Sequence, residues 1–263
     1  MPTLLVVAAA IPIIYIVAPL LHILTNTDWS HAEQLLADTD FQGALFTSVT
    51  AACCSTLAAV VLGLPTAYYL SVTSFFGKPV IEGLLLLPLV LPPVVGGMSL
   101  LSTFGPDTAL GSLFAGLGLP LTNSILGVVI AQFYITSPFV ILSAKAGFDE
   151  VPRELKEAVQ IDGGGTWHIF WNICIPSCRS AIAAGTALTF ARAIGEFGAT
   201  MIVAYHPYTI PVDIWVAFTS GGLDTIVPIT AVITLFTASV TIIGAIGRRF
   251  ISRTIHMGGK LGR

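Results

Sequence analysis

Between two long apolar runs, residues 151–176 read VPRELKEAVQIDGGGTWHIFWNICIP. The first half of this stretch alternates in a helical pattern, with apolar residues on one face and charged residues on the other. The apolar positions are Leu155, Ala158 and Val159. The pattern predicts a short amphipathic helix in a loop that joins two segments too apolar for water.

The three glycines at 163–165 mark the end of this helix, because glycine adopts the left-handed conformation that a helix end needs. A second short helix is predicted over 166–172, and Pro176 precedes the next apolar run. The loop is therefore expected to be folded rather than disordered.

The rest of the chain has the composition of a membrane protein. Of its 263 residues, 55% are apolar and only 10% are charged, whereas soluble domains carry about 25% charged residues. A membrane core about 30 Å thick needs roughly 20 apolar residues in a helix. Six segments meet this requirement: 4–24, 44–70, 81–104, 121–144, 180–205 and 226–246. Backbone groups in lipid must be satisfied internally, so we predict an all-α, polytopic protein with six transmembrane helices.

The positions of lysine and arginine predict the orientation of these helices. The second and fourth loops and the tail after the last helix hold all of them except Arg192, and the other three loops hold none. Cytoplasmic loops carry the excess of basic residues, so both termini are predicted to be cytoplasmic. No basic residue precedes the run at 4–24, which favours a first span over a cleaved signal peptide.

Two of the predicted spans contain unusual residues. The third is interrupted by prolines and glycines at 88–97, which indicates either a kinked packing helix or a helix bent to line a cavity. The fifth contains Arg192 and Glu196 at i, i+4. Charged residues inside a membrane are costly and face the interior. Arg192 and Glu196 either form an internal ion pair, or Arg192 lies on a pathway and weakly attracts an anion.

The loop resembles the signature of the permeases of ABC importers, which reads E-A-A, three residues, G, nine residues, I, one residue, L-P. The matching residues are Glu157, Ala158, Val159, Gly163, Ile173, Ile175 and Pro176. Val159 stands in place of the third alanine and Ile175 in place of leucine, and both exchanges are apolar. In this family the loop couples the permease to the ATPase, so the resemblance gives that role to Leu155, Glu157, Ala158, Val159, Gly163, Ile173 and Pro176.

Two further stretches are similar to permeases for molybdate, tungstate and sulfate. They are ARAIGEFGAT at 191–200 and LPPVVGG at 91–97. The stretch VAYHP at 203–207, with Ile-Pro at 210–211, looks nearest to archaeal-type molybdate/tungstate permeases.

The resemblance implies the architecture of a type I ABC importer permease, with residues 1–263 as one transmembrane domain. It implies a homodimer in the plasma membrane, two ATP-binding ABC subunits on the cytoplasmic face, and an external substrate-binding protein. The expected cargo is a tetrahedral oxyanion, with molybdate or tungstate first and sulfate or another oxyanion as the alternative.

Other classes of function find less support in the sequence. There is no G-x-x-x-x-G-K-[ST] loop, so ATP hydrolysis is expected in a separate subunit, and we expect no enzyme activity and no cofactor. The four cysteines, Cys53, Cys54, Cys174 and Cys178, are interpreted as buried thiols rather than a metal site. The net charge of −3, with no basic stripe, excludes a nucleic-acid partner. An ion-coupled secondary transporter is the remaining alternative, although only Glu196 would serve it as a carboxylate at the middle of the membrane.

Overall fold

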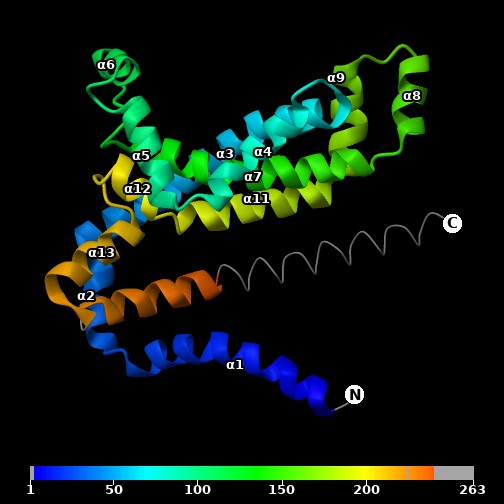
Figure 1. Cartoon of the computed structure of the whole chain (residues 1–263). Coiled ribbons are helices and arrows are strands. Elements are labelled where there is room, and N and C mark those ends of the chain that lie inside the picture. Colours follow the sequence, from blue (N-terminus) through cyan, green and yellow to red (C-terminus); the bar gives the residue numbers. More distant parts are fainter. Residues whose placement is uncertain (1–2, 224, 240–263) are drawn as a thin grey trace. The chain divides into compact units, whose positions relative to one another are not determined.

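The computed structural model describes residues 3–223 and 225–239, and within these ranges every regular element is a helix (Figure 1). The prediction of an all-α fold is therefore confirmed. The chain divides into two compact units, residues 1–42 with 214–263, and residues 43–213.

The first unit contains α1 (Thr3–Asn26), α2 (Trp29–Ala37) and the apolar helix Thr225–Ser239. Within α1, Leu5–Asn26 is long and apolar enough to cross a membrane, which confirms the first predicted span. The sixth predicted span, 226–246, overlaps Thr225–Ser239, and its remainder lies outside the described residues.

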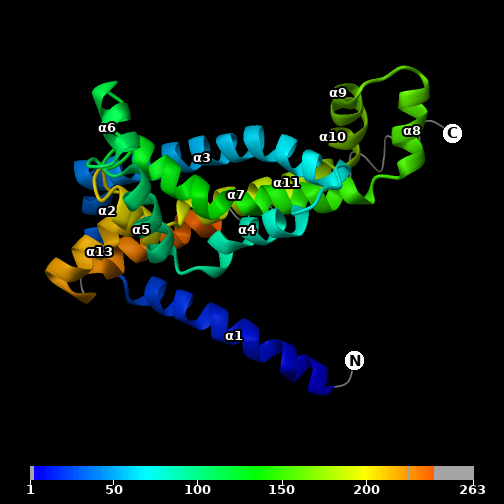
Figure 2. The same cartoon turned by 45° about the horizontal axis from the view of Figure 1, so that its top comes forward.

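The second unit is built around two more long helices, α3 (Thr39–Val72) and α7 (Ile125–Glu150), and α11 (Arg179–Ile194) runs back along α7 (Figure 2). Small residues let these helices approach closely. A Cβ added at Gly185 of α11 would lie 2.7 Å from the Cβ of Ser143 on α7. The second and fourth predicted spans are thus confirmed, with boundaries shifted by two to six residues.

The third predicted span, 81–104, is wrong as a single helix. The structure divides it into α4 (Lys78–Val90) and α5 (Pro93–Phe104), which are bent by 113°. The residue before a proline avoids the helical conformation, and Leu91 and Pro92 accordingly take extended backbone angles. At 13 and 12 residues, each helix is only about 20 Å long, and α6 (Ala109–Gly116) follows.

The fifth predicted span, 180–205, is also interrupted. Its first helix, α11, ends at Ile194, and α12 (Gly198–Val203) begins after three residues of irregular backbone, before α13 (Ile210–Gly221). The described residues hold three helices able to cross a membrane, or up to five spans if two bent pairs, α4 with α5 and Thr166–Ser177 with α11, each count as one.

The interpretation of all four cysteines as buried is only half right. Cys174 and Cys178 are buried in the core of the second unit, whereas Cys53 and Cys54 are exposed on α3. Which side chains of an apolar helix are buried depends on its tertiary packing, and the sequence alone did not show that these two thiols lie on the exposed side of α3.

Candidate coupling segment and pathway residues

The predicted amphipathic helix exists as α8 (Arg153–Ile161). At its end Gly163 has a φ of +83°, and its N–H donates to the carbonyl of Gln160 at 3.1 Å. The N–H of Gly164 donates to the carbonyl of Val159 at 2.8 Å. The sequence prediction that glycine turns the chain here is confirmed, because a positive φ is the conformation that favours glycine.

The second short helix is longer than predicted. It begins at Thr166 as expected but continues past 172, through α9 (Thr166–Ile169), the π-helical turn η1 (Phe170–Cys174) and α10 (Ile175–Ser177). Pro176 has no N–H to donate to the carbonyl four residues earlier, and the adjacent turn takes the wider π form, in which the N–H of Ile175 donates to the carbonyl of Phe170. This segment is bent by 78° from α11.

Aromatic packing fixes this segment to the ends of α3 and α7. Phe170 is 1% exposed, and its ring centroid lies 5.1 Å from that of Tyr68 and 6.2 Å from that of Phe148. Ile169 and Cys174 are buried in the same cluster. The loop is therefore part of the folded unit and packs directly against two long helices.

The predicted coupling residues divide between two surroundings. Glu157 and Ala158 are exposed, and Leu155 is 48% exposed, whereas Val159 packs against the chain's own core. Ile173 also packs against that core, and Pro176 is exposed. Glu157 pairs with Arg153 at 2.8 Å on the surface, and such pairs contribute less than about 1 kcal/mol.

The sequence analysis missed a cluster of charges that joins α4 to α7. The ammonium of Lys145 lies 2.7 Å from a carboxylate oxygen of Asp149 and 3.3 Å from one of Glu82, and Lys78 lies 4.0 Å from Glu82. Two i, i+4 pairs of opposite charge, at 78/82 and 145/149, were visible in the sequence. Their contact across two helices was not, because it depends on tertiary packing.

Arg192 and Glu196 form the predicted ion pair, but not on one continuous helix. Glu196 lies in the irregular backbone after α11, its carboxylate is 2.5 Å from the guanidinium of Arg192, and it is fully buried. Its other oxygen accepts from the N–H of Ala199 at 2.9 Å, in the first turn of α12. The side chain of Arg192 is 35% exposed, so one end of the pair is fixed and the other is accessible.

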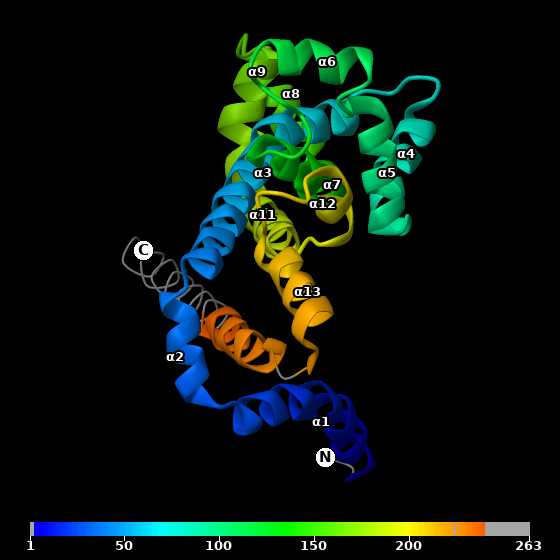
Figure 3. The same cartoon turned by 90° about the vertical axis from the view of Figure 1, so that its left-hand side faces the viewer.

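The interruptions of the third and fifth predicted spans lie side by side, because α5 packs on α12 (Figure 3). A Cβ added at Gly97 of α5 would lie 2.9 Å from the backbone of Ala199, and one added at Gly198 would lie 2.9 Å from Pro93. The glycines allow this close approach, which places Glu196 next to the junction of the two broken helices.

Comparison with known proteins agrees with this architecture. The family described as "Binding-protein-dependent transport system inner membrane component" matches residues 59–257. A probable molybdenum ABC transporter permease of Haloferax volcanii is 50% identical over 186 residues, 71% of this chain and 68% of that protein. A molybdate/tungstate transport system permease of Thermococcus kodakarensis is 32% identical over 200 residues, 76% of each chain. A sulfate transport system permease of Synechocystis is 34% identical over 171 residues, 65% of this chain and 62% of that protein.

Among solved structures, a bacterial alginate ABC transporter in complex with an alginate-bound periplasmic protein has the same fold. The TM-score is 0.71 at 16% identity, over 92% of this chain and 91% of that one. The helices and their interruptions define a multi-pass integral membrane protein. The chain belongs to the inner membrane components of binding-protein-dependent transport systems, the permease subunits of ABC importers.

Proposed function

We propose that this chain forms the pathway of an ATP-driven importer for molybdate or tungstate, as a homodimer in the plasma membrane with both termini in the cytoplasm. The observation that carries the proposal is the 50% identity over 71% of the chain to a protein named as a molybdenum permease. The Thermococcus relative, named for molybdate and tungstate, supports the same cargo.

The charge at the junction of the broken helices suits a pathway for a dianion. Arg192 is the accessible cation, and Glu196 offsets part of its charge at 2.5 Å. A pathway must attract its ion without holding it, because conduction requires release. A single partly neutralised arginine meets this requirement better than a dense basic site would.

Coupling to the ATPase is assigned to residues 151–176. Leu155 and Ala158 are exposed on α8 and are available to enter a groove on an ATP-hydrolysing subunit, the helix-in-groove mode of recognition. Val159 and Ile173 pack on the core of the permease itself, so the segment has one surface for the partner and one for the membrane helices. An external binding protein delivers the anion to the opposite face.

Sulfate is the second candidate cargo, because the Synechocystis relative is named as a sulfate permease. Uptake into proteoliposomes separates the two, with the permease, its ATPase subunits and its binding protein reconstituted together. We expect ATP-dependent molybdate uptake that excess sulfate does not suppress. Sulfate uptake with no molybdate uptake would reverse the assignment of the cargo.

Leu155→Asp tests the coupling role. We expect the variant permease to lose its association with the ATPase subunit in a pull-down. Leu113→Asp is the matched control, since Leu113 is also exposed on a short helix, α6, at the opposite end of the second unit. Equal association of both variants with the ATPase subunit would show that α8 does not contribute to the interface.

Arg192→Gln tests the pathway role. We expect uptake to fall at least about tenfold with unchanged assembly and ATPase association, and Arg192→Lys to restore part of it. Normal uptake by Arg192→Gln would leave the pair with Glu196 as a purely structural contact.

A further inference from the structure

The helix α8 has few attachments to the rest of the second unit. None of its residues is buried. Its apolar contact is Val159, which packs against the core that includes Phe148 and Phe170. Its one side-chain hydrogen bond to another element, among the described residues, comes from Lys156, whose ammonium donates to the carbonyl of Phe148 at 3.0 Å.

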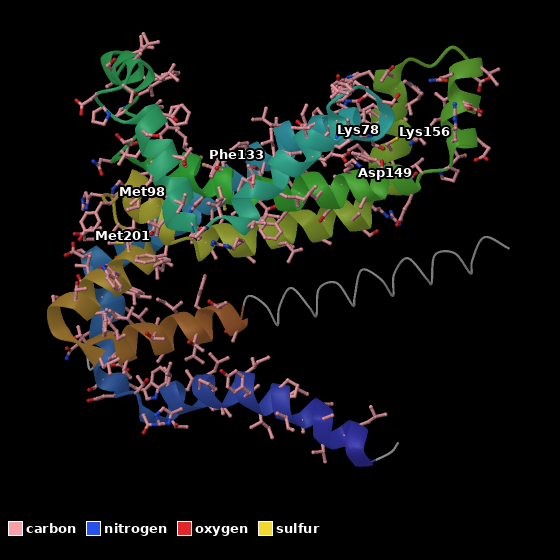
Figure 4. The ribbon with its side chains drawn as sticks, viewed as in Figure 1. Lys78, Met98, Phe133, Asp149, Lys156 and Met201 are labelled. Atoms are coloured by element: carbon pink, nitrogen blue, oxygen red, sulfur yellow. The ribbon has the colours of Figure 1, made fainter. Side chains whose placement is uncertain are left out.

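The acceptor of this bond lies in the last turn of α7, which ends at Glu150. The carbonyls at the end of a helix lack their i+4 partners and carry the helix's negative partial charge, so a lysine there is favoured. The carbonyl of Phe148 also accepts from the N–H of Val151 at 3.4 Å. Lys156 approaches this end of α7 near Asp149 (Figure 4). The bond is partly shielded from water, since Lys156 is half-buried.

The acceptor is also held firmly in place. Phe148 is 0% exposed, and its ring packs edge-on against Tyr68 at 5.9 Å between centroids. One residue later, Asp149 pairs with Lys145, which also pairs with Glu82 of α4. The last turn of α7 is therefore bonded on one side to α8 and on another to the helix that leads to the α4–α5 bend.

We propose that Lys156 is a positioning residue that fixes α8 on the last turn of α7, and that it determines how fully a displacement of α8 reaches the membrane helices. The inference rests on the proposed role of residues 151–176 in coupling. Leu155 and Ala158 face the partner, whereas Lys156 bonds the same helix to α7. Without it, the contact of Val159 is what attaches α8 to the core among the described residues, and α8 moves partly independently of the bundle.

The first test uses the permease alone in lipid nanodiscs, so that it does not depend on any ATPase. Hydrogen–deuterium exchange is measured for Lys156→Met, Lys156→Arg and the control Arg179→Met. Arg179 is an exposed cation that makes no hydrogen bond or ion pair to the residues that the structure describes. We expect amides of α8 to exchange about tenfold faster in Lys156→Met, since a hydrogen bond to a charged group is lost. Lys156→Arg and Arg179→Met should match the wild type, and unchanged exchange in Lys156→Met would overturn the proposal.

The second test measures anions transported per ATP hydrolysed in the reconstituted complex. For Lys156→Met we expect ATPase association to persist and the transport ratio to fall severalfold, with recovery in Lys156→Arg. A wild-type ratio in Lys156→Met would refute the positioning role while leaving the proposed function intact, provided that Leu155→Asp still abolishes coupling. If Leu155→Asp also has no effect, the coupling role of the whole segment fails instead.

Discussion

Replacing Gly97 with alanine tests the contact that brings the two broken helices together. The added Cβ would lie 2.9 Å from both the Cα and the carbonyl oxygen of Ala199 and 3.0 Å from the Cβ of Ile202. The first two atoms are backbone, so no side-chain rotation relieves the overlap. The two helices α5 and α12 must move apart, and the environment of Glu196, which caps α12 through Ala199, changes with them.

The expected cost follows from opposing effects. Alanine at a helical glycine gains about 0.5–1 kcal/mol from backbone entropy and helix propensity, whereas overpacking of a tight contact costs about 1–3 kcal/mol. Because the overlap is with backbone, we take the upper part of the overpacking range, about 2–3 kcal/mol. The net loss of unfolding free energy expected for Gly97→Ala is then about 1–2.5 kcal/mol, and Tm should fall by roughly 2–10 °C for a chain of this size.

The assay is thermal unfolding in detergent, with ATP-dependent uptake measured in parallel. Gly83→Ala is the matched control, because Gly83 is also a helical glycine, on α4, and nothing lies within 4 Å of its added Cβ. We expect that variant to be at least as stable as the wild type and to transport normally. Equal stability and equal uptake of Gly97→Ala and Gly83→Ala would show that α5 and α12 do not pack as described.

Three further substitutions probe the segment and the ion pair. Gly163→Ala should lower the free energy of unfolding by the cost of a positive φ, about 1–2 kcal/mol, and lower Tm accordingly. Gly165→Ala, at φ −75° with open space around it, should leave Tm unchanged. Equal Tm values for the two variants would contradict the turn. Phe170→Ala should lower the free energy of unfolding by about 3–5 kcal/mol in a thermal melt, because the ring is buried. A loss below about 1 kcal/mol would refute that packing. Glu196→Gln should lower the free energy of unfolding by about 1–3 kcal/mol, because it leaves Arg192 without its anion. Adding Arg192→Gln to the same chain should recover part of that loss. If the losses of the two substitutions simply add, the pair is not formed.

The parts of the fold that local chemistry determines were predictable. Long apolar runs identified α1, α3 and α7, because the thickness of the membrane fixes their length. The glycine at 163 was recognised as a turn, because its backbone conformation is a local property of the chain. The prolines at 92 and 93 marked an interruption, and the two open interpretations were a kink or a bend.

The parts that depend on packing between distant segments were not predictable. The 113° bend after α4 requires α5 to pack on α12, and no pattern within 81–104 encodes that partner. Glu196 was placed on the helix of Arg192 by its spacing, but α11 ends at Ile194, so the spacing identified the pair and not the end of the helix between its two members. The bonds Lys145–Glu82 and Lys156–Phe148 join residues whose proximity arises from the tertiary fold.

ATP-dependent molybdate uptake by the reconstituted complex tests the central claim most directly. Proteoliposomes containing the permease, the ATPase subunits and the binding protein should accumulate molybdate only when ATP is supplied on the side of residues 151–176. Accumulation by the permease alone, or accumulation unaffected by withholding ATP, would contradict the account.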